Sequence, residues 1–466
     1  MNGMVPVAMF GWIPVALGIL LSLPIRKGIL AAYLAGWLFL PQASYEVAGL
    51  PDYTRMTAVN GALLLFLLMI DGRTLLSQRP RWFDLPMLVW CLCPIPTSVT
   101  NDLGVYDGLS GALEQLLAWG VPYWIGRCYF NDWASVRLLA IAVFIGGLIY
   151  VPLCLFEIRM SPQLHRWVYG YHRAWGGERL GGYRPAVFLN TGLELGLWMS
   201  ATALVGIWLW RTRALRELWG VPAGVLSGGL FVTTVLCRSL GSLALLLAAL
   251  AALSLLWATR WRWVALAFFL LPAAYVAARA PQVWSPQRVV GLVESFDAER
   301  ARSLASRLNQ EEVLTARAWQ QPWFGWGGYG RNRVLNEFGV SSTVTDALWL
   351  ITFGIYGLTG LAALGLALAL PGLLLWQRLR VDEWWSPVTG PAVALAFAAT
   401  LYALDGLMNA MLNPIYHLML GAVTSVAVGA GAQAAQTLRV RRVVRVVRPA
   451  AATAAPPTVQ DVGSNG

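Results

Sequence analysis

The feature that most constrains the fold is a series of apolar segments that recurs along nearly the whole chain. A helix needs about 20 apolar residues to cross the hydrocarbon core of a bilayer. Only 12% of the residues are charged and 58% are hydrophobic, which is typical of polytopic membrane proteins. We therefore predict an all-α membrane helix bundle of 12–13 spans, the lower count applying if the first segment is a half-span. The predicted spans are 4–23, 28–47, 56–70, 85–99, 109–125, 138–156, 191–210, 219–236, 240–257, 263–278, 347–376, 388–409 and 415–434.

Basic residues follow every odd-numbered apolar segment. Loops rich in Lys and Arg remain in the cytoplasm, so we predict residues 1–436 to be a multi-pass bundle with its C-terminus inside. The N-terminus then lies outside, or inside if the first segment is a half-span. Residues 437–466 are predicted to be a basic, disordered cytoplasmic tail whose arginines contact anionic membrane lipids. The loop residues are Arg26, Lys27, Arg73, Arg79, Arg81, Arg127, Arg137, Arg211, Arg213, Arg216, Arg260, Arg262, Arg378 and Arg380.

Two predicted outward loops, 157–190 and 279–346, break this pattern because they are also rich in arginine. Most of these arginines are expected to pair with nearby acidic residues. Arg238 is different, because it stands between two apolar segments, where an arginine is costly without an anionic partner. Arginine binds phosphate oxygens in a bidentate geometry. We therefore predict that Arg184, Arg238 and Arg307 converge on one diphosphate group at one membrane face.

The segment 297–320 is predicted to be an amphipathic helix with Asp297 as its N-cap. Pro322 ends it, and the glycine-rich stretch 325–330 follows as a turn whose backbone N–H groups could approach a ligand. This stretch lacks both the strand context of a dinucleotide fingerprint and the lysine of a P-loop. The predicted apolar stripe of the helix is formed by Ala301, Leu304, Ala305 and Leu308.

Asp346 opens the next apolar segment, and it has two interpretations. A carboxylate at a helix N-terminus is most simply a cap. It could also be an anionic group beside the predicted arginine site. Gly354, Gly357 and Gly360 follow, and they are expected to thin one face of the helix for close packing, with Gly357 on the same face as Asp346.

These residues, in this order, resemble the O-antigen ligase and O-antigen polymerase superfamily of undecaprenyl-diphosphate-dependent glycosyltransferases. The spacing 307–322 followed by G-x-G resembles the large-loop signature of the family. The stretch R-P-A-V-F-L-N-T-G-L around Arg184, C-R-S-L-G around Arg238 and the late D-G-L-M-N-A-M-L-N-P also fit. Asp346-Ala347, then nine residues, then G-x-x-G resembles the ligase signature, but ligases carry histidine where Asp346 stands. This difference favours the polymerase branch.

The resemblance implies a metal-independent, inverting glycosyltransferase without a cofactor at the outer face of the bacterial inner membrane. Its substrates would be an undecaprenyl-diphosphate-linked saccharide and an acceptor glycan, with polysaccharide-assembly proteins as further partners and no nucleic acid. The site would use arginines against the diphosphate and Asp346 to orient or deprotonate the acceptor hydroxyl. Arg317, Arg331 and Arg333 are secondary candidates for the diphosphate site. His165, His172 and His417 have no metal-ligand spacing.

Two other functions stay open. One is an O-antigen ligase that acts on a lipid or protein acceptor. The other is a lipid-saccharide flippase or secondary transporter, because Glu114, Glu194 and Asp405 lie in or near apolar segments, although no internal repeat is evident. An enzyme should group its arginines and Asp346 around one outward cavity. A transporter should line a cavity that reaches the midplane with charge.

Overall fold

The computed structural model describes residues 2–47, 49, 51–171, 178–179, 181–282, 290–291, 294–295, 298–335, 337–338, 341, 343 and 346–429. Two sequence-based predictions, the tail 437–466 and the N-cap Asp297, lie outside these residues, as does His172. The predicted all-α class is confirmed, because the described chain is mostly helical and its strands form only three two-residue antiparallel hairpins. These are β1 (Ser44–Tyr45) with β2 (Tyr53–Thr54), β3 (Glu178–Arg179) with β4 (Gly182–Tyr183), and β5 (Glu217–Leu218) with β6 (Val221–Pro222).

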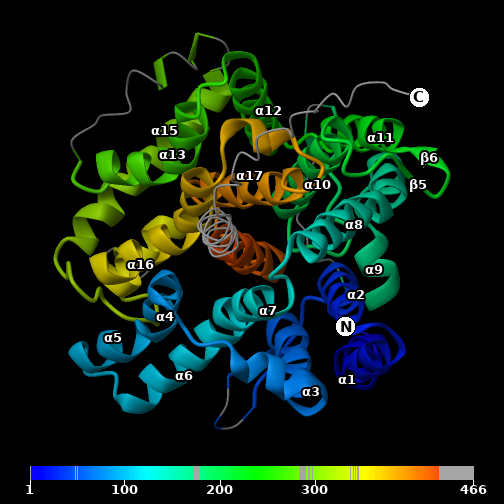
Figure 1. Ribbon diagram of the computed structural model, residues 1–466. Coiled ribbons are helices and arrows are strands. Elements are labelled where there is room, and N and C mark those ends of the chain that lie inside the picture. Colours follow the sequence, from blue (N-terminus) through cyan, green and yellow to red (C-terminus); the bar gives the residue numbers. More distant parts are fainter. Residues whose placement is uncertain are drawn as a thin grey trace, which may run out of the picture.

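The helices follow the apolar segments of the sequence (Figure 1). In the first half they are α1 (Met4–Ser22), α2 (Ile25–Phe39), α3 (Arg55–Ser77), α4 (Leu85–Leu92), α5 (Pro94–Thr100), α6 (Val105–Gln115), α7 (Val121–Tyr129), α8 (Trp133–Met160) and α9 (Leu164–Tyr169). In the second half they are α10 (Gly192–Arg211), α11 (Ala223–Leu236), α12 (Leu240–Thr259), α13 (Trp263–Arg279), α15 (Ala298–Ala318), α16 (Leu348–Arg378), α17 (Gly390–Asp405) and a last helix, Pro414–Gly429.

Six of the described helices are long and apolar enough to cross a membrane: α1, α3, α8, α10, α12 and α16. A seventh span results if α4 and α5, which meet at a bend of 41°, are counted together. The expected 12–13 spans exceed this number for two physical reasons. Four apolar helices are shorter, namely α11, α13, α17 and Pro414–Gly429, and α2, whose first turn carries two basic residues, has only 15 residues. Another predicted span is divided into α6 and α7 by one turn of π-helix, Leu116–Gly120.

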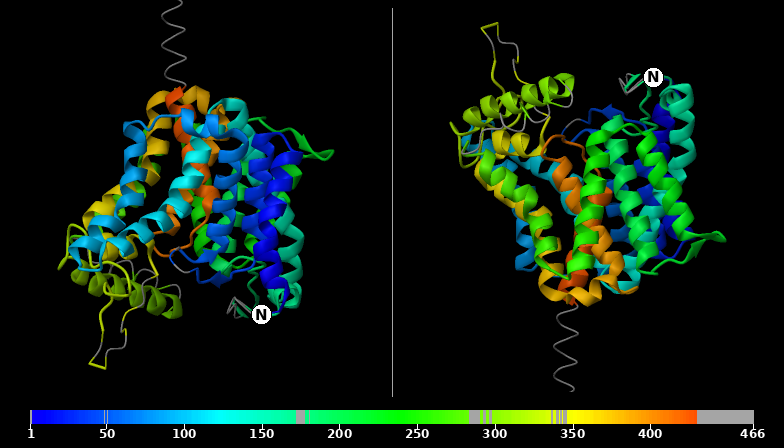
Figure 2. Two further views of the ribbon diagram at one scale, coloured as in Figure 1. Left: turned by 90° about the horizontal axis from the view of Figure 1, so that it is seen from below. Right: turned by 90° about the horizontal axis from the view of Figure 1, so that it is seen from above.

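The bundle has two distinct ends, and Figure 2 shows α15 at one of them together with the N-terminus. We call it the α15 end. Hydrogen bonds link loops there, as in Arg331 Nη1 to the carbonyl of Asn101 at 2.9 Å. At the opposite end, an ion pair of 2.8 Å joins Arg26, in the first turn of α2, to Asp132, the N-cap of α8. The described loop residues that are basic and predicted to be cytoplasmic lie in loops of the opposite end or in the helix ends beside them.

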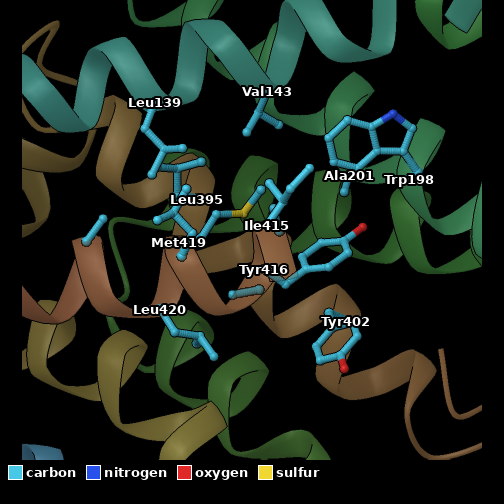
Figure 3. Close-up of a cluster of buried hydrophobic side chains, with 14 of the residues drawn as sticks. Leu139, Val143, Trp198, Ala201, Leu395, Tyr402, Ile415, Tyr416, Met419 and Leu420 are labelled. Atoms are coloured by element: carbon cyan, nitrogen blue, oxygen red, sulfur yellow. The ribbon is translucent and has the colours of Figure 1, made fainter. Parts of the chain in front are cut away.

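The centre of the bundle is formed by α10, α17 and the helix Pro414–Gly429, which are almost completely buried. Figure 3 shows part of this core, where Trp198 of α10, Tyr402 of α17 and Tyr416 of the last helix meet side chains from α8. The rings of Tyr402 and Tyr416 stack at 4.7 Å between centroids. These helices carry few charges and are apolar on all sides, as expected for helices surrounded by other helices.

The glycine-rich turn after Pro322 is paired with a break in α16. At Gly357 the backbone adopts φ +65° and ψ −162°, a region open almost only to glycine. The N–H groups of Trp326 and Gly327 donate to the carbonyls of Gly354 (2.9 Å) and Ile355 (3.1 Å), and the N–H of Leu358 donates to Pro322 (2.7 Å). The prediction that N–H groups of this turn bind a ligand is therefore wrong for Trp326 and Gly327, because α16 already uses them.

Candidate functional site

A cavity of ≈ 300 Å³ brings Arg307 and Asp346 together at the α15 end. α15 supplies Arg307, and Asp346 lies two residues before the start of α16. The guanidinium of Arg307 donates a long hydrogen bond of 3.5 Å to the carbonyl of Met408. Within the described part of the chain, neither Arg307 nor Asp346 forms an ion pair. The complete lining is Ser306, Arg307, Gln310, Glu311, Asp346, Ala347, Leu350 and Met408.

Asp346 is not the N-cap of α16. The N-cap position belongs to Ala347, which makes no side-chain capping hydrogen bond. Instead, the N–H of Leu348 donates to the carbonyls of Gly406 at 2.9 Å and Asn409 at 3.1 Å, so backbone atoms satisfy it. The carboxylate of Asp346 is exposed to solvent. The expectation that Asp346 and Gly357 share one helical face is also wrong, because Asp346 precedes the helix and Gly357 breaks it.

Glu311 fixes α15 onto the bundle beside this cavity. Its carboxylate is 3% exposed and accepts hydrogen bonds from Arg279 Nε (3.1 Å) and from the hydroxyl of Tyr275 (3.0 Å). Burial raises the pKa of Glu311 above its ordinary value, although the hydrogen bonds from Tyr275 and Arg279 oppose the rise. The pair with Arg279 agrees with the expectation that most loop arginines bind local carboxylates.

This raised pKa predicts a pH dependence of stability. A carboxyl group whose pKa is higher in the folded state stabilises the protein at low pH, and the contribution is lost as pH rises through the folded-state pKa. We expect Glu311→Gln to flatten the dependence of the thermal unfolding temperature on pH above about 4.3, the usual pKa of glutamate. Unfolding of both proteins in detergent across this range measures it, with Glu217→Gln, at an exposed glutamate of β5, as control. Parallel curves for wild type and Glu311→Gln would contradict the assignment.

Arg184 and Arg238 lie close together, also at the α15 end. Nη2 of Arg184 donates to the hydroxyl of Ser239, the residue after Arg238, at 2.9 Å. The guanidinium of Arg238 rests against Gly182, where a Cβ would lie 2.5 Å from it. Arg184 itself is 8% exposed and packs over Gly192. Two glycines therefore make room for these two arginines.

Asp405, at the end of α17, connects this pair with Arg307. Its buried carboxylate interacts electrostatically with both Arg307 and Arg184, and it accepts a hydrogen bond of 2.9 Å from Asn409. Arg184 and Arg238 are not among the residues that line the cavity of Arg307 and Asp346. The four predicted residues thus form two pairs, and Asp405 interacts with one arginine of each; they do not line one cavity.

Sequence reasoning did not assign Glu311 or Asp405 to the site. Glu311 could have been found, because it follows Arg307 by four residues and so shares its helical face. Asp405 was noted only as a charge in an apolar segment. Its neighbours Arg184 and Arg307 are distant in sequence, and only the packing of α17 against the loops brings the three together.

The secondary candidates Arg317, Arg331 and Arg333 do not join Arg307. They line a separate cavity of ≈ 610 Å³ at the C-terminal part of α15. Arg317 lies over the ring of Trp326, 3.4 Å from its centroid. This cavity and that of Arg307 and Asp346 have no lining residue in common.

A long apolar cavity of ≈ 390 Å³ begins beside the cavity of Arg307 and Asp346. It runs between α13, α16 and α17, and no charged residue lines it. The two cavities are lined by different but consecutive residues: Ala347 and Met408 line the first, and Leu348 and Leu407 line the second. A polar cavity beside an apolar cavity suits an amphiphilic ligand.

Comparison with known proteins does not place the chain in a family. No protein-family model matches the chain, and no curated protein matches it in sequence.

Proposed function

We propose that this protein transfers or polymerises saccharides linked to undecaprenyl diphosphate, at the outer face of the bacterial inner membrane. A polysaccharide polymerase is favoured over an O-antigen ligase. In this proposal the shorter and divided apolar helices also cross the membrane, giving the full 12–13 spans, with the α15 end outside and the basic end in the cytoplasm.

The observation that carries the proposal is the cavity in which Arg307 of α15 lies with Asp346 next to an apolar groove. A lipid-linked saccharide needs these three parts. A cation must bind the diphosphate, and a hydrogen-bond acceptor or general base must contact the attacking hydroxyl. An apolar surface must bind the lipid. Arg184 and Arg238 lie nearby and supply further positive charge. Arg184 donates a hydrogen bond to Ser239, and both Arg184 and Arg307 interact electrostatically with Asp405.

The chemistry is a single displacement at the anomeric carbon. The acceptor oxygen forms the new glycosidic bond while the bond from the anomeric carbon to the diphosphate oxygen breaks, and its electron pair leaves with the diphosphate. The arginines stabilise the negative charge that develops on this leaving group. Asp346 takes the proton of the acceptor hydroxyl or orients that hydroxyl. A single displacement inverts the anomeric configuration.

The first test concerns Arg307. If Arg307 stabilises the departing diphosphate, Arg307→Gln should lower kcat/KM for an undecaprenyl-diphosphate-linked repeat unit by about 10²–10³-fold. Polymer formation by purified protein in lipid nanodiscs, resolved by gel electrophoresis, measures this. Arg302→Gln is the matched control, because Arg302 is an exposed arginine of the same helix that donates a hydrogen bond to the carbonyl of Ala298 and does not line the cavity.

Three outcomes discriminate the functions. Polymer formed from the lipid-linked unit alone supports a polymerase, whereas a requirement for a separate lipid or protein acceptor supports a ligase. Movement of the intact lipid-linked saccharide between leaflets, with no glycosidic bond formed, would replace both by a transporter. The ion pairs Arg127–Asp84 (2.8 Å) and Arg55–Glu194 (3.6 Å) favour the enzyme, because these buried charges of the bundle are matched to one another.

A further inference from the structure

The cavity of Arg317, Arg331 and Arg333 is a concentration of positive charge that the proposed transfer does not use. No carboxylate is among its lining residues. Within the described residues, none of the three arginines forms an ion pair. The complete lining is Val313, Ala316, Arg317, Gln320, Trp326, Gly330, Arg331, Arg333, Val334 and Leu335.

Neutral groups hold two of these arginines in place. Arg317 stacks on Trp326 and donates to Gln320 Oε1 at 2.7 Å and to the carbonyl of Arg331 at 3.3 Å. Arg331 in turn donates to the carbonyl of Asn101 at 2.9 Å. These contacts fix the guanidinium groups without neutralising them. Burial and the nearby charge of Arg331 lower the pKa of Arg317, so an anion between them would relieve an existing repulsion.

The position of the cavity separates it from the proposed lipid site. Arg307 and Arg317 are ten residues apart on α15, which at 1.5 Å per residue is roughly 15 Å along the helix axis. The apolar cavity is lined by residues next in sequence to those of the Arg307 cavity, whereas none of its lining residues is next to one that lines the cavity of Arg317. A lipid headgroup at the Arg307 cavity therefore leaves this second cavity to a part of the substrate distant from the lipid.

We propose that this second cavity binds an acidic group of the glycan, a carboxylate or phosphate carried by a sugar at some distance from the reacting end. The planar fork of arginine suits both anions. The assignment rests on the proposed function for the origin of the glycan, but binding itself requires no turnover. The protein is thereby assigned to acidic polysaccharides and not to neutral ones.

The test measures binding to full-length protein in nanodiscs of zwitterionic phosphatidylcholine. The probes are hexagalacturonate, which carries a carboxylate on every sugar, and maltohexaose, which is neutral. Wild type should bind the acidic hexasaccharide more tightly than the neutral one. The double variant Arg331→Gln/Arg333→Gln should lower the affinity for the acidic probe by about 10–100-fold, because each charged hydrogen bond contributes appreciably to binding. The affinity for the neutral probe should not change. Arg317 is kept because it also packs on Trp326.

Two controls locate the effect. Arg302→Gln removes an arginine of α15 that does not line the cavity, and it should leave hexagalacturonate binding unchanged. Nanodiscs that contain anionic phosphatidylglycerol test the other source of an anion. If phosphatidylglycerol displaces hexagalacturonate in wild type and not in the double variant, the cavity is a lipid-headgroup site and the proposal is overturned.

Equal affinity of wild type for the two hexasaccharides, or undiminished acidic binding in the double variant, would also overturn the inference. Failure of the proposed function gives a different result. Wild type that binds hexagalacturonate through Arg331 and Arg333 but forms no glycosidic bond upholds the acidic site and removes the transferase. Wild type that polymerises a lipid-linked unit without binding the acidic probe upholds the transferase and removes the acidic site.

Discussion

Replacing Asp346 with asparagine is expected to lower the rate of saccharide transfer by about 10²–10⁴-fold, the usual contribution of a general base. Asparagine has nearly the same shape but cannot accept the proton of the acceptor hydroxyl. A helix-capping role would predict little change, since asparagine caps as well as aspartate. The structure already speaks against capping, because Ala347 holds the N-cap position and backbone carbonyls satisfy the N–H of Leu348.

Single-turnover polymerisation in nanodiscs measures the chemical step apart from binding. Asp382→Asn provides the control, since Asp382 is an exposed aspartate at the opposite end of the bundle. The variant must also elute as a folded, monodisperse protein. Full activity of Asp346→Asn would remove Asp346 from the chemistry and leave the transferase proposal to depend on the arginines.

The second large effect is expected at Gly357, the break in α16. Alanine there would strain the backbone at φ +65°, and its Cβ would lie 2.5 Å from the carbonyl of Trp323. Strain and overpacking at about 1–3 kcal/mol each give a destabilisation of about 2–6 kcal/mol. The same contact viewed from the other side predicts a similar loss for Gly325→Ala, because its Cβ would lie 2.5 Å from the carbonyl of Ile355.

Thermal unfolding of the purified protein and the fraction recovered in monodisperse form measure both glycine variants. The control is Gly61→Ala in α3, because Gly61 lies inside a helix with no atom near the position of a new Cβ. Alanine should leave stability unchanged or raise it slightly there, since it favours helix more than glycine does. A Gly357→Ala protein as stable as wild type would show that the turn does not pair with α16 as described.

Most helices of this protein could be predicted from its sequence, because they are apolar segments bounded by charged or turn residues. The amphipathic helix around Arg307 was predicted as well, and α15 (Ala298–Ala318) confirms it, with Ala301 and Leu308 buried. The break at Gly357 was not predicted. A glycine in an apolar helix usually indicates close helix packing, and only the arrival of a turn from outside the helix makes this one a break.

The candidate site was predictable in its residue types and only partly in its grouping. Arg307 and Asp346 were expected together and line one cavity, and Arg184 was expected beside Arg238 and lies near it. Arg317 and Arg307 were both expected at one diphosphate. They are separate because they lie far apart along α15. Their distance along the helix could have been calculated from the sequence, but the direction in which α15 crosses the bundle could not.

The pairing of the glycine-rich turn with the broken α16 has a consequence for which substrate lengths the protein could accept. This pairing attaches Trp326 to α16 by a backbone hydrogen bond. Trp326 lines the cavity of Arg317, Arg331 and Arg333. Leu350, in the first turn of α16, lines the cavity of Arg307 and Asp346. The two cavities are therefore held at a fixed separation by backbone hydrogen bonds, not by flexible side chains. If both bind one glycan, the protein acts as a molecular ruler. It would select a saccharide by the distance between its diphosphate and its acidic sugar.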